Sequence, residues 1–309
     1  MRFSAQLPTD RVTKGAEFAS AAAIGEMTRA LEAAGFDAVY ATEHPFPPAA
    51  WLAAGGHHAL DPFVALAAAA TASSRLRLHT NVLVLAYRNP FLAAKAVASL
   101  DAISEGRVIV GVAAGYLEKE FDALGADFEH RNDVADDALV AMKLAWSGAD
   151  VKHAGRGYRA SGNTMLPLPI QKPHPPLWVG GNSRRAARRA VLHGQGWSPF
   201  PAPAAVGRQT RTAAIESLDD LALRIGELRA YAEEIGRSEP LDVNFVPFGQ
   251  GMNPRVLPDA DAFCEQVVKL SEIGVTSLSV GLPCATRAAY CENAARFSES
   301  VIDRLRSRR

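Results

Sequence analysis

The sequence predicts an α/β fold, an eight-stranded parallel (β/α)8 barrel of the TIM type with insertions. The first indication is a strand-like run followed by a loop and an amphipathic helix, a unit that recurs eight times. The second is the length of 309 residues, which suits a single barrel. The third argues against a doubly wound sheet, because no G-x-G-x-x-G turn follows the first strand and no change of composition divides the chain. We therefore expect one barrel domain over residues 1–309.

The first four strands are predicted at residues 2–7, 36–42, 76–85 and 107–115. The helix after the first strand ends at Gly35, which can adopt the left-handed conformation that stops a helix. The next helix begins at Asp61-Pro62, an N-cap followed by the favoured first-turn proline. The third helix, residues 89–104, also begins with a proline, and the fourth covers residues 133–148.

Residues 149–176 have little pattern and form a first insertion. The remaining strands are predicted at residues 176–181, 196–200, 241–248 and 275–282, and the helices that follow them at 183–194, 218–236, 259–274 and 286–307. A second insertion, rich in proline and alanine, occupies residues 199–205. In a barrel of this kind the carboxyl ends of the strands form the active face, so candidate site residues are sought there.

Composition excludes several classes of partner. The 33 Lys and Arg residues balance the 33 Asp and Glu residues, which disfavours nucleic acid. The longest apolar run, residues 62–72, is too short to cross a bilayer, and the amino terminus lacks a signal-peptide pattern, so we expect no membrane association and a cytoplasmic location. Cys264, Cys284 and Cys291 show no metal-ligand spacing and are expected to be reduced, and no metal is predicted.

The second strand ends in Glu43-His44, followed by the proline-rich stretch PFPP. One interpretation is an ordinary loop histidine paired with its neighbour or with solvent. The other is an imidazole that faces a pocket and transfers protons near neutral pH. The prolines restrict the following backbone and would hold the ring in place, so His44 is our candidate catalytic residue.

Two more strand ends carry unusual residues. Thr80-Asn81 interrupts an apolar strand, either as a bulge or as polar groups directed at the barrel mouth. The fourth strand ends in small residues, including Ala114, that would let a ligand approach the backbone. Tyr116 follows where a pocket-lining side chain is expected, whereas Glu118 and Glu120 are predicted to lie in a solvated turn.

The stretch WVGGNSRR, residues 178–185, has the composition of an anion site at a helix amino terminus. Gly180 and Gly181 permit close approach, while Asn182 and Ser183 open the helix. An ordinary tight turn with an N-cap would look the same. His57-His58 could bind a metal, but no third ligand lies at a useful spacing. Hydrolase and nucleotide-binding motifs are absent.

Four stretches of the sequence together resemble the luciferase-like monooxygenase superfamily, and most of all its branch that uses the deazaflavin coenzyme F420. These are GFDAVYATEH, YRNPFLAAKAVASLDAISEGRVIVGVAAGYLEKEFDALG, PLPIQKPHPPLWVGGNS and HGQGWSP. The resemblance covers about residues 1–197 and is diffuse beyond. It implies a β/α barrel with insertions, a homodimer, and a flavin or deazaflavin at the carboxyl ends of the strands.

The resemblance also implies roles for single residues. His44 matches a histidine near the reactive ring, and Glu43 an acidic neighbour that contacts the ring system. Asn81-Val82 falls where the family has a non-prolyl cis peptide against the ring face. The turn formed by Gly180, Gly181, Asn182 and Ser183 matches the turn near the cofactor's phosphate-bearing chain.

Two departures bear on the substrate. The sugar-phosphate dehydrogenase branch has a catalytic glutamate where this chain has Tyr116, and a tryptophan where it has Pro48. Sugar-phosphate oxidation is therefore disfavoured. Trp51 is expected to supply an aromatic wall, so that Trp51 and Tyr116 line the substrate pocket.

Our leading hypothesis is an F420-dependent oxidoreductase that moves a hydride between the deazaflavin and an organic substrate, with His44 handling the proton. One alternative is an FMN-dependent monooxygenase that uses reduced flavin and oxygen. Another is a flavin-binding protein without catalytic activity. The sequence leaves the substrate and the direction of hydride transfer open.

Overall fold

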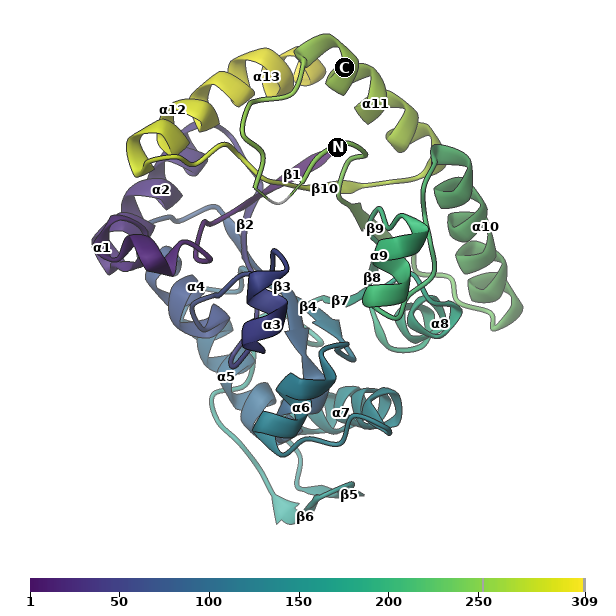
Figure 1. Ribbon diagram of the computed structural model, residues 1–309. Helices are drawn as coiled ribbons and strands as arrows, with labels where there is room; N and C mark the ends of the chain where they lie inside the picture. Colours follow the sequence, from purple (N-terminus) through teal and green to yellow (C-terminus); the bar gives the residue numbers. More distant parts are fainter. Residues whose placement is uncertain (252, 308–309) are drawn as a thin grey trace.

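The computed structural model describes residues 1–251 and 253–307. Eight parallel strands form a closed barrel in the order β1-β10-β9-β8-β7-β4-β3-β2, with helices around it (Figure 1). This confirms the predicted (β/α)8 barrel. The barrel strands are β1 (Arg2–Gln6), β2 (Ala38–Ala41), β3 (Arg77–Val84), β4 (Val108–Ala113), β7 (Leu177–Gly180), β8 (Gly196–Ser198), β9 (Asp242–Phe245) and β10 (Ser277–Val280).

The helices of the outer layer follow the predicted positions closely. They are α1 (Ala16–Ala19), α2 (Ala21–Ala33), α4 (Pro62–Ala70), α5 (Pro90–Ile103), α7 (Arg131–Trp146), α8 (Arg184–His193), α10 (Leu218–Glu234), α11 (Ala260–Ile273), α12 (Arg287–Phe297) and α13 (Asp303–Arg306). Three short helices, α3 (Ala49–Ala53), α6 (Glu118–Leu124) and α9 (Ala204–Gln209), lie within the strand-to-helix connections.

Side-chain caps explain where several helices begin. The Asp61 carboxylate accepts hydrogen bonds from the backbone N–H groups of Phe63 and Val64 at the start of α4. Asn89 caps α5 in the same way, and both helices have proline as their first residue. Caps of this kind satisfy N–H groups that have no partner inside the helix.

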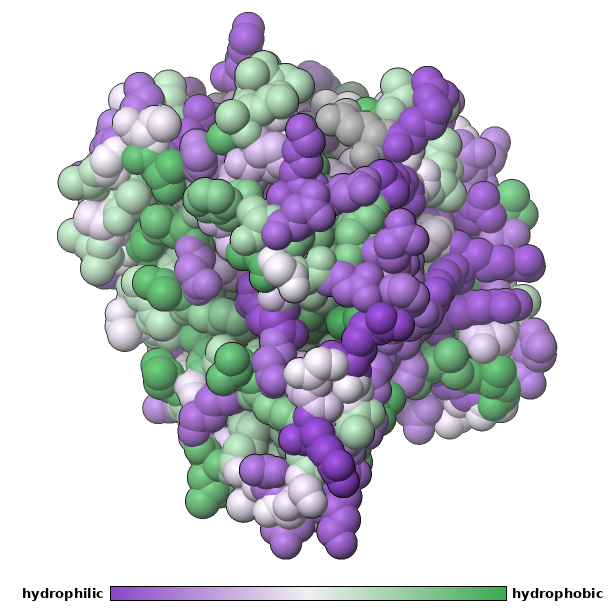
Figure 2. All heavy atoms as spheres, turned by 60° about the horizontal axis from the view of Figure 1, so that its bottom comes forward, coloured by the Kyte–Doolittle hydropathy of each residue, from purple (hydrophilic) through white to green (hydrophobic). Residues whose placement is uncertain are grey.

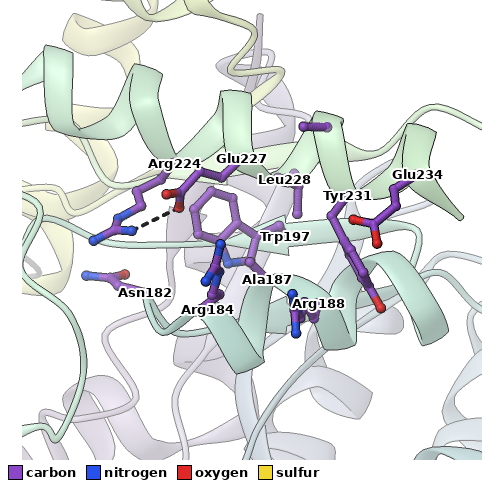
Figure 3. A pocket seen from close by; sticks show the side chains of 11 residues that line it. Asn182, Arg184, Ala187, Arg188, Trp197, Arg224, Glu227, Leu228, Tyr231 and Glu234 are labelled. Carbon is purple, nitrogen blue, oxygen red and sulfur yellow. Dashed lines mark hydrogen bonds and ion pairs between the residues drawn. The ribbon is translucent and has the colours of Figure 1, made fainter.

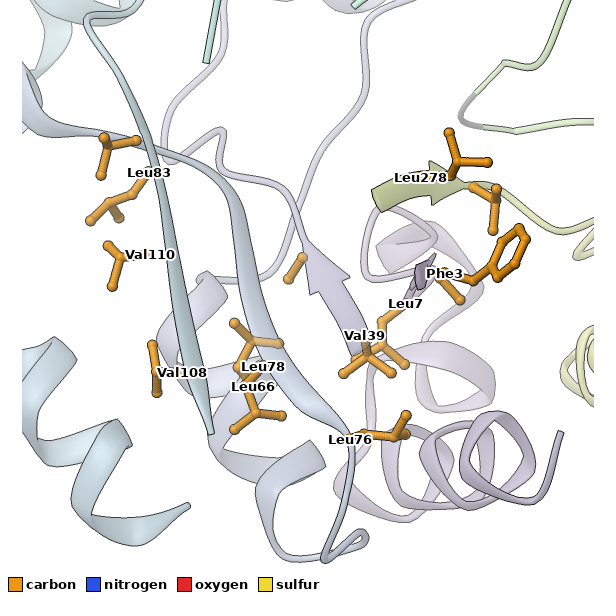
Figure 4. Packing of buried hydrophobic residues seen from close by; sticks show 14 of the residues in the cluster. Phe3, Leu7, Val39, Leu66, Leu76, Leu78, Leu83, Val108, Val110 and Leu278 are labelled. Carbon is orange, nitrogen blue, oxygen red and sulfur yellow. The ribbon is translucent and has the colours of Figure 1, made fainter. Parts of the chain in front are cut away.

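The main hydrophobic core lies between the barrel and its helices. Alternate strand residues such as Phe3, Val39 and Leu78 point outward, because successive side chains of a strand lie on opposite faces. Figure 4 shows them beside Leu66 of α4 and Leu76. This layer accounts for the apolar strands that the sequence displays.

The inner face of the barrel is polar. Asn244 of β9 donates hydrogen bonds to Ser198 (2.8 Å) and Ser279 (3.0 Å). At one end Arg2 pairs with Asp242. Polar groups therefore continue from the barrel interior up to the carboxyl ends of the strands.

The first insertion contains structure that the sequence pattern did not predict. Strands β5 (Val151–Gly155) and β6 (Tyr158–Asn163) form an antiparallel hairpin that projects from the barrel at the bottom of Figure 1. Asp137 of α7 anchors it through His153 (2.8 Å) and Tyr158. The hairpin is mostly exposed, so it lacks the apolar pattern of a buried strand.

The surface differs between the two sides of the barrel. Hydrophilic residues dominate the right-hand side of Figure 2, where α8 and α10 lie in Figure 1. Apolar residues gather on the left, the side on which α4 and α5 lie in Figure 1. Val64 of α4 and Leu92 of α5 are exposed apolar side chains. Within the described residues no helix is both long and apolar enough to span a bilayer.

Candidate active site at the carboxyl ends of the strands

His44 lies three residues beyond the end of β2, on the rim where all the strands end. Its Nδ1 is 3.3 Å from Oε2 of Glu120, which belongs to α6. The structure therefore pairs the predicted catalytic residue with a carboxylate that follows a different strand.

Glu120 is fully buried and forms the centre of a hydrogen-bond network. The Tyr87 hydroxyl donates to Oε2 (2.7 Å), and the backbone N–H of Phe46 donates to Oε1 (3.0 Å). Burial alone would raise the pKa of Glu120, but the hydrogen bonds from His44 and Tyr87 outweigh it and the pKa is lowered. The carboxylate is thus ionised at neutral pH and can accept a hydrogen bond from His44 Nδ1.

The prediction that Glu120 lies in a solvated turn is wrong. Glu118 is indeed exposed and pairs with Arg211 (2.7 Å), but Glu120, two residues further along α6, lies on the opposite, buried face of the helix. Leu117, Glu120, Phe121 and Leu124 have the i, i+3, i+4, i+7 spacing of one helix face. Reading this short stretch as a helix would have placed Glu120 inward.

Aromatic rings surround His44. The ring centroids of Trp51, His57 and Tyr116 lie 4.5, 4.9 and 6.4 Å from that of His44. Burial lowers the pKa of His57, while burial and the charge of Glu120 raise the pKa of Tyr116 to about 12. Both rings are therefore neutral at pH 7, and the predicted pocket residues Trp51 and Tyr116 lie together at this site.

The structure does not place His57 and His58 in a metal centre. His57 packs against His44, and its Nδ1 lies 2.9 Å from the backbone oxygen of His58. Within the described ranges, no group of three or more His, Cys, Asp or Glu residues is arranged to hold a metal ion.

Glu43 is directed into the protein. Its carboxylate accepts a hydrogen bond from the Val84 backbone N–H (2.7 Å) and pairs with Arg88. Burial raises the pKa of Glu43, although the charge of Arg88 opposes this shift. Both oxygens thus tie the end of β2 to the end of β3, and the structure gives this residue a supporting position behind the rim.

The end of β3 carries the other predicted ring contacts. The peptide bond between Asn81 and Val82 is cis, as the resemblance implied. Asn81 donates to the Ser279 hydroxyl (3.3 Å), whereas the Thr80 hydroxyl donates to the backbone oxygen of Gly111 (2.9 Å). Thr80 therefore faces the neighbouring strand, and Asn81 faces across the barrel.

The turn between β7 and α8 is held by Asn182. Its carboxamide donates to the backbone oxygens of Phe200 and Ala213 (both 2.9 Å) and accepts from the Phe200 N–H (3.0 Å), and its own N–H donates to Thr212 (2.9 Å). Asn182 thus ties the second insertion to this turn. The Ser183 hydroxyl caps α8 by accepting a hydrogen bond from the Ala186 N–H, because the first N–H groups of a helix have no partner within the helix.

Replacing Asn182 with alanine is expected to lower the free energy of unfolding by about 2 kcal/mol, because two buried carbonyls and one N–H would lose their partners. Urea denaturation would measure the change. Asn293→Ala is the control, since that side chain makes one hydrogen bond, to Pro283 (3.0 Å). Equal losses in the two variants would contradict a structural role for Asn182.

Two arginines near this turn, Arg131 and Arg211, belong to no motif recognised in the sequence. The guanidinium groups of Arg131 and Arg211 both lie over the ring of Phe128, at 4.1 and 4.6 Å from its centroid. Arg131 also donates to the backbone oxygen of Gly115 (3.2 Å), just beyond β4. Because β4 and β7 are neighbours in the barrel, these cations lie on the same side of the rim as the start of α8.

A groove of about 200 Å³ lies outside the barrel between α8 and α10 (Figure 3). Arg184 and the ion pair of Arg224 with Glu227 line it, and Trp197 lies among them. No residue of the cluster around His44 lines this groove. Asn182, at the turn between β7 and α8, also lines it.

The family model for luciferase-like monooxygenases matches residues 1–251. The chain belongs to the luciferase-like monooxygenase family. Members of this family are oxidoreductases or monooxygenases that use a flavin or a deazaflavin, and this protein is an enzyme of that class.

Relatives of this luciferase-like protein include enzymes of both kinds. It is 28% identical to an F420-dependent glucose-6-phosphate dehydrogenase of Beutenbergia cavernae, over 90% of this chain and 91% of the relative. It is 30% identical to the oxygenase component of a flavin-dependent trigonelline monooxygenase of Acinetobacter baylyi, over 45% of this chain and 41% of the relative. Its fold is similar to that of the monooxygenase RslO1 of Streptomyces bottropensis, with a TM-score of 0.78, 20% identity, and coverage of 98% and 99% of the two chains.

Proposed function

We propose that this protein is an F420-dependent oxidoreductase that transfers a hydride between the deazaflavin and a small organic substrate. The observation that carries the proposal is His44, held by ionised Glu120 at the end of a barrel strand. The similarity to an F420-dependent dehydrogenase over nine-tenths of the chain supports the deazaflavin over FMN. The homodimeric state implied by the resemblance and the cytoplasmic location expected from the sequence belong to the same proposal.

The residues at the ends of β3, β4 and β7 fit a planar ring. A Cβ atom added to Gly180 would lie 3.1 Å from Val82 and 3.8 Å from the Ala113 Cβ, so these three residues adjoin one another and form one wall at the strand ends. We assign the ring to this wall. The residues that would contact the ring system are Asn81, Val82 and Ala114, while Glu43 and Thr80 would support these strand ends from behind.

The phosphate-bearing chain of the cofactor would lie at the start of α8. The residues that would contact it are Gly180, Gly181 and Ser183, with Asn182 holding the shape of the turn through its internal hydrogen bonds. A helix amino terminus favours an anion through its N–H groups and its dipole. Arg131 adds a positive charge on this side of the rim, where its guanidinium donates to the backbone oxygens of Gly115 and Phe128.

His44 would move the proton that accompanies hydride transfer. When bound, the cofactor supplies the ring carbon that accepts or donates the hydride. Because ionised Glu120 accepts a hydrogen bond from Nδ1, Nε2 of neutral His44 carries the lone pair and takes up the proton that the substrate loses. In the reverse direction the same atom returns the proton. Trp51 packs against the imidazole and helps to exclude water.

An FMN-dependent monooxygenase is the second candidate, supported by the similarity to the trigonelline monooxygenase component. Both cofactors would present a tricyclic ring and a phosphate to the same rim. Consumption of oxygen in the presence of reduced FMN distinguishes this activity from hydride transfer.

Fluorescence titration of the purified apoprotein with F420 and, separately, with FMN tests the cofactor assignment. We expect F420 to bind with a Kd at least about tenfold lower than that of FMN, a difference of about 1.4 kcal/mol. We also expect Arg131→Ala to weaken F420 but not the same deazaflavin without its phosphate chain. The exposed Arg208→Ala of α9 is the control.

The outcomes separate the two candidates. A preference for FMN together with oxygen consumption would replace the hydride-transfer proposal with the monooxygenase. If neither cofactor binds, the proposed cofactor site is wrong.

A further inference from the structure

Four buried oxygen atoms at or just beyond the ends of β1 and β2 have no hydrogen-bond partner within the described residues. They are Gln6 Oε1, Thr9 Oγ1, Asp10 Oδ1 and Thr42 Oγ1. Gln6, Thr9, Thr42 and the side chain of Asp10 are between 2% and 6% exposed. A buried polar atom without a partner costs about 1–3 kcal/mol, so native proteins leave few of them without a function.

These atoms belong to adjacent strand ends. β1 and β2 pair in parallel, with Gln6 opposite Tyr40. Gln6 and Thr42 lie on the inner face of the barrel. Their chain neighbours Leu7 and Ala41 belong to the outer core, and successive side chains of a strand point to opposite faces. Thr9 and Asp10 follow β1 directly, as His44 follows β2. The four oxygens therefore line the rim beside the candidate catalytic residue.

Asp10 connects this group of oxygens to the aromatic rings around His44. Its charge opposes the shift that burial produces in the pKa of His57, although burial prevails. The His57 ring is in turn 4.9 Å from that of His44. Asp10 thus acts on the same pocket as the aromatic cluster, from the side of β1.

The environment of Asp10 indicates which group it would bind. Its Oδ2 accepts a hydrogen bond from the Asn253 side chain (2.9 Å), and Arg11 lies 4.0 Å from the same atom. The carboxylate charge is therefore already balanced by a guanidinium. A second cation such as an ammonium would meet Arg11, whereas a neutral hydroxyl would add only the hydrogen-bond donor that Oδ1 lacks.

We propose that Asp10, together with Thr9 and Thr42, forms a substrate subsite that binds a hydroxyl group. The substrate class is a neutral alcohol or polyol rather than an amine or a carboxylate. This inference rests on the proposed function in one respect, because it places the substrate of that reaction beside His44. The sequence pattern showed no sign of it, since Asp10 lies outside every motif.

Binding of cyclohexanol and cyclohexanone to the full-length apoprotein tests the subsite. The two probes share a ring, but only the alcohol can donate a hydrogen bond. We expect the unchanged protein to bind cyclohexanol at least about tenfold more tightly, as measured by saturation-transfer NMR titration. Asp10→Asn should lose most of this preference, and Thr9→Val, which removes only the neutral hydroxyl oxygen, should lose less.

Asp219→Asn is the matched control, because it removes an exposed carboxylate from the outer helix α10. Circular dichroism would establish that each variant is folded. If Asp10→Asn does not fold, the alcohol preference of Thr9→Val still decides the test. The proposal is overturned if the unchanged protein binds both probes equally, or if the folded variants keep the full preference for the alcohol. F420 titration of the same variants separates the two proposals, since loss of the alcohol preference with normal F420 binding concerns the subsite alone.

Discussion

Replacing His44 with alanine is expected to lower the turnover of the F420-loaded enzyme by about 100- to 10,000-fold, the usual contribution of a general acid or base. In the proposed mechanism the proton is moved by this imidazole, whose Nδ1 lies 3.3 Å from the ionised Glu120. F420 affinity should change little, because the proposed ring and phosphate contacts come from β3, β4 and α8. Stopped-flow measurement of hydride transfer and F420 titration would give the two quantities separately.

His58→Ala is the control for this experiment. His58 is the exposed neighbour of the ring cluster, and its contact with His57 uses only its backbone oxygen. Unchanged turnover in His44→Ala would remove His44 from the proposed mechanism. Binding of F420 without turnover in the unchanged protein would instead support a carrier without catalytic activity.

Replacing Glu120 with alanine is expected to affect both stability and turnover. The Tyr87 hydroxyl and the Phe46 N–H would each lose a buried acceptor, and we expect the free energy of unfolding to fall by about 3–5 kcal/mol. Turnover should also fall, because His44 Nδ1 would lose the group that fixes its tautomer. Urea denaturation and the pH profile of turnover would measure the two effects.

Glu120→Gln separates the positioning role from the structural one. It keeps the shape of the side chain but removes its charge, so it should lower turnover and shift the pH profile while most of the stability remains. Glu118→Ala on the exposed face of α6 is the control and should change stability by less than about 0.5 kcal/mol. A normal pH profile in Glu120→Gln would contradict the positioning role.

The lowered pKa of Glu120 also gives the direction in which the stability of the fold depends on pH. In the unfolded chain a glutamate titrates near pH 4.3, and in the folded protein the pKa lies below that value. The network therefore contributes its full stability above about pH 4.3 and loses it as the pH falls through the folded pKa. Urea midpoints between about pH 3 and about pH 7 should fall less steeply in Glu120→Gln than in the unchanged protein.

Much of the fold and the core of the candidate site could be predicted from local patterns. Apolar strands, proline-led helices and the caps at Asp61 and Asn89 depend on residues that are close in the sequence. The same holds for His44 and for the start of α8 at Ser183. The hairpin of β5 and β6 escaped prediction because its strands are short and mostly exposed.

The sequence by itself determined the order of the strands and helices, the rim as the place of chemistry, and His44 as the residue to examine. Only the tertiary structure decided which groups surround that residue. Closure of the barrel brings Glu120 from beyond β4 to His44 from beyond β2. It also places at the end of β1 the Asp10 oxygen that has no hydrogen-bond partner among the described residues. Burial and the surrounding hydrogen-bond donors then set the pKa of Glu120. A carboxylate in a loop sequence gives no indication of the donors that will enclose it.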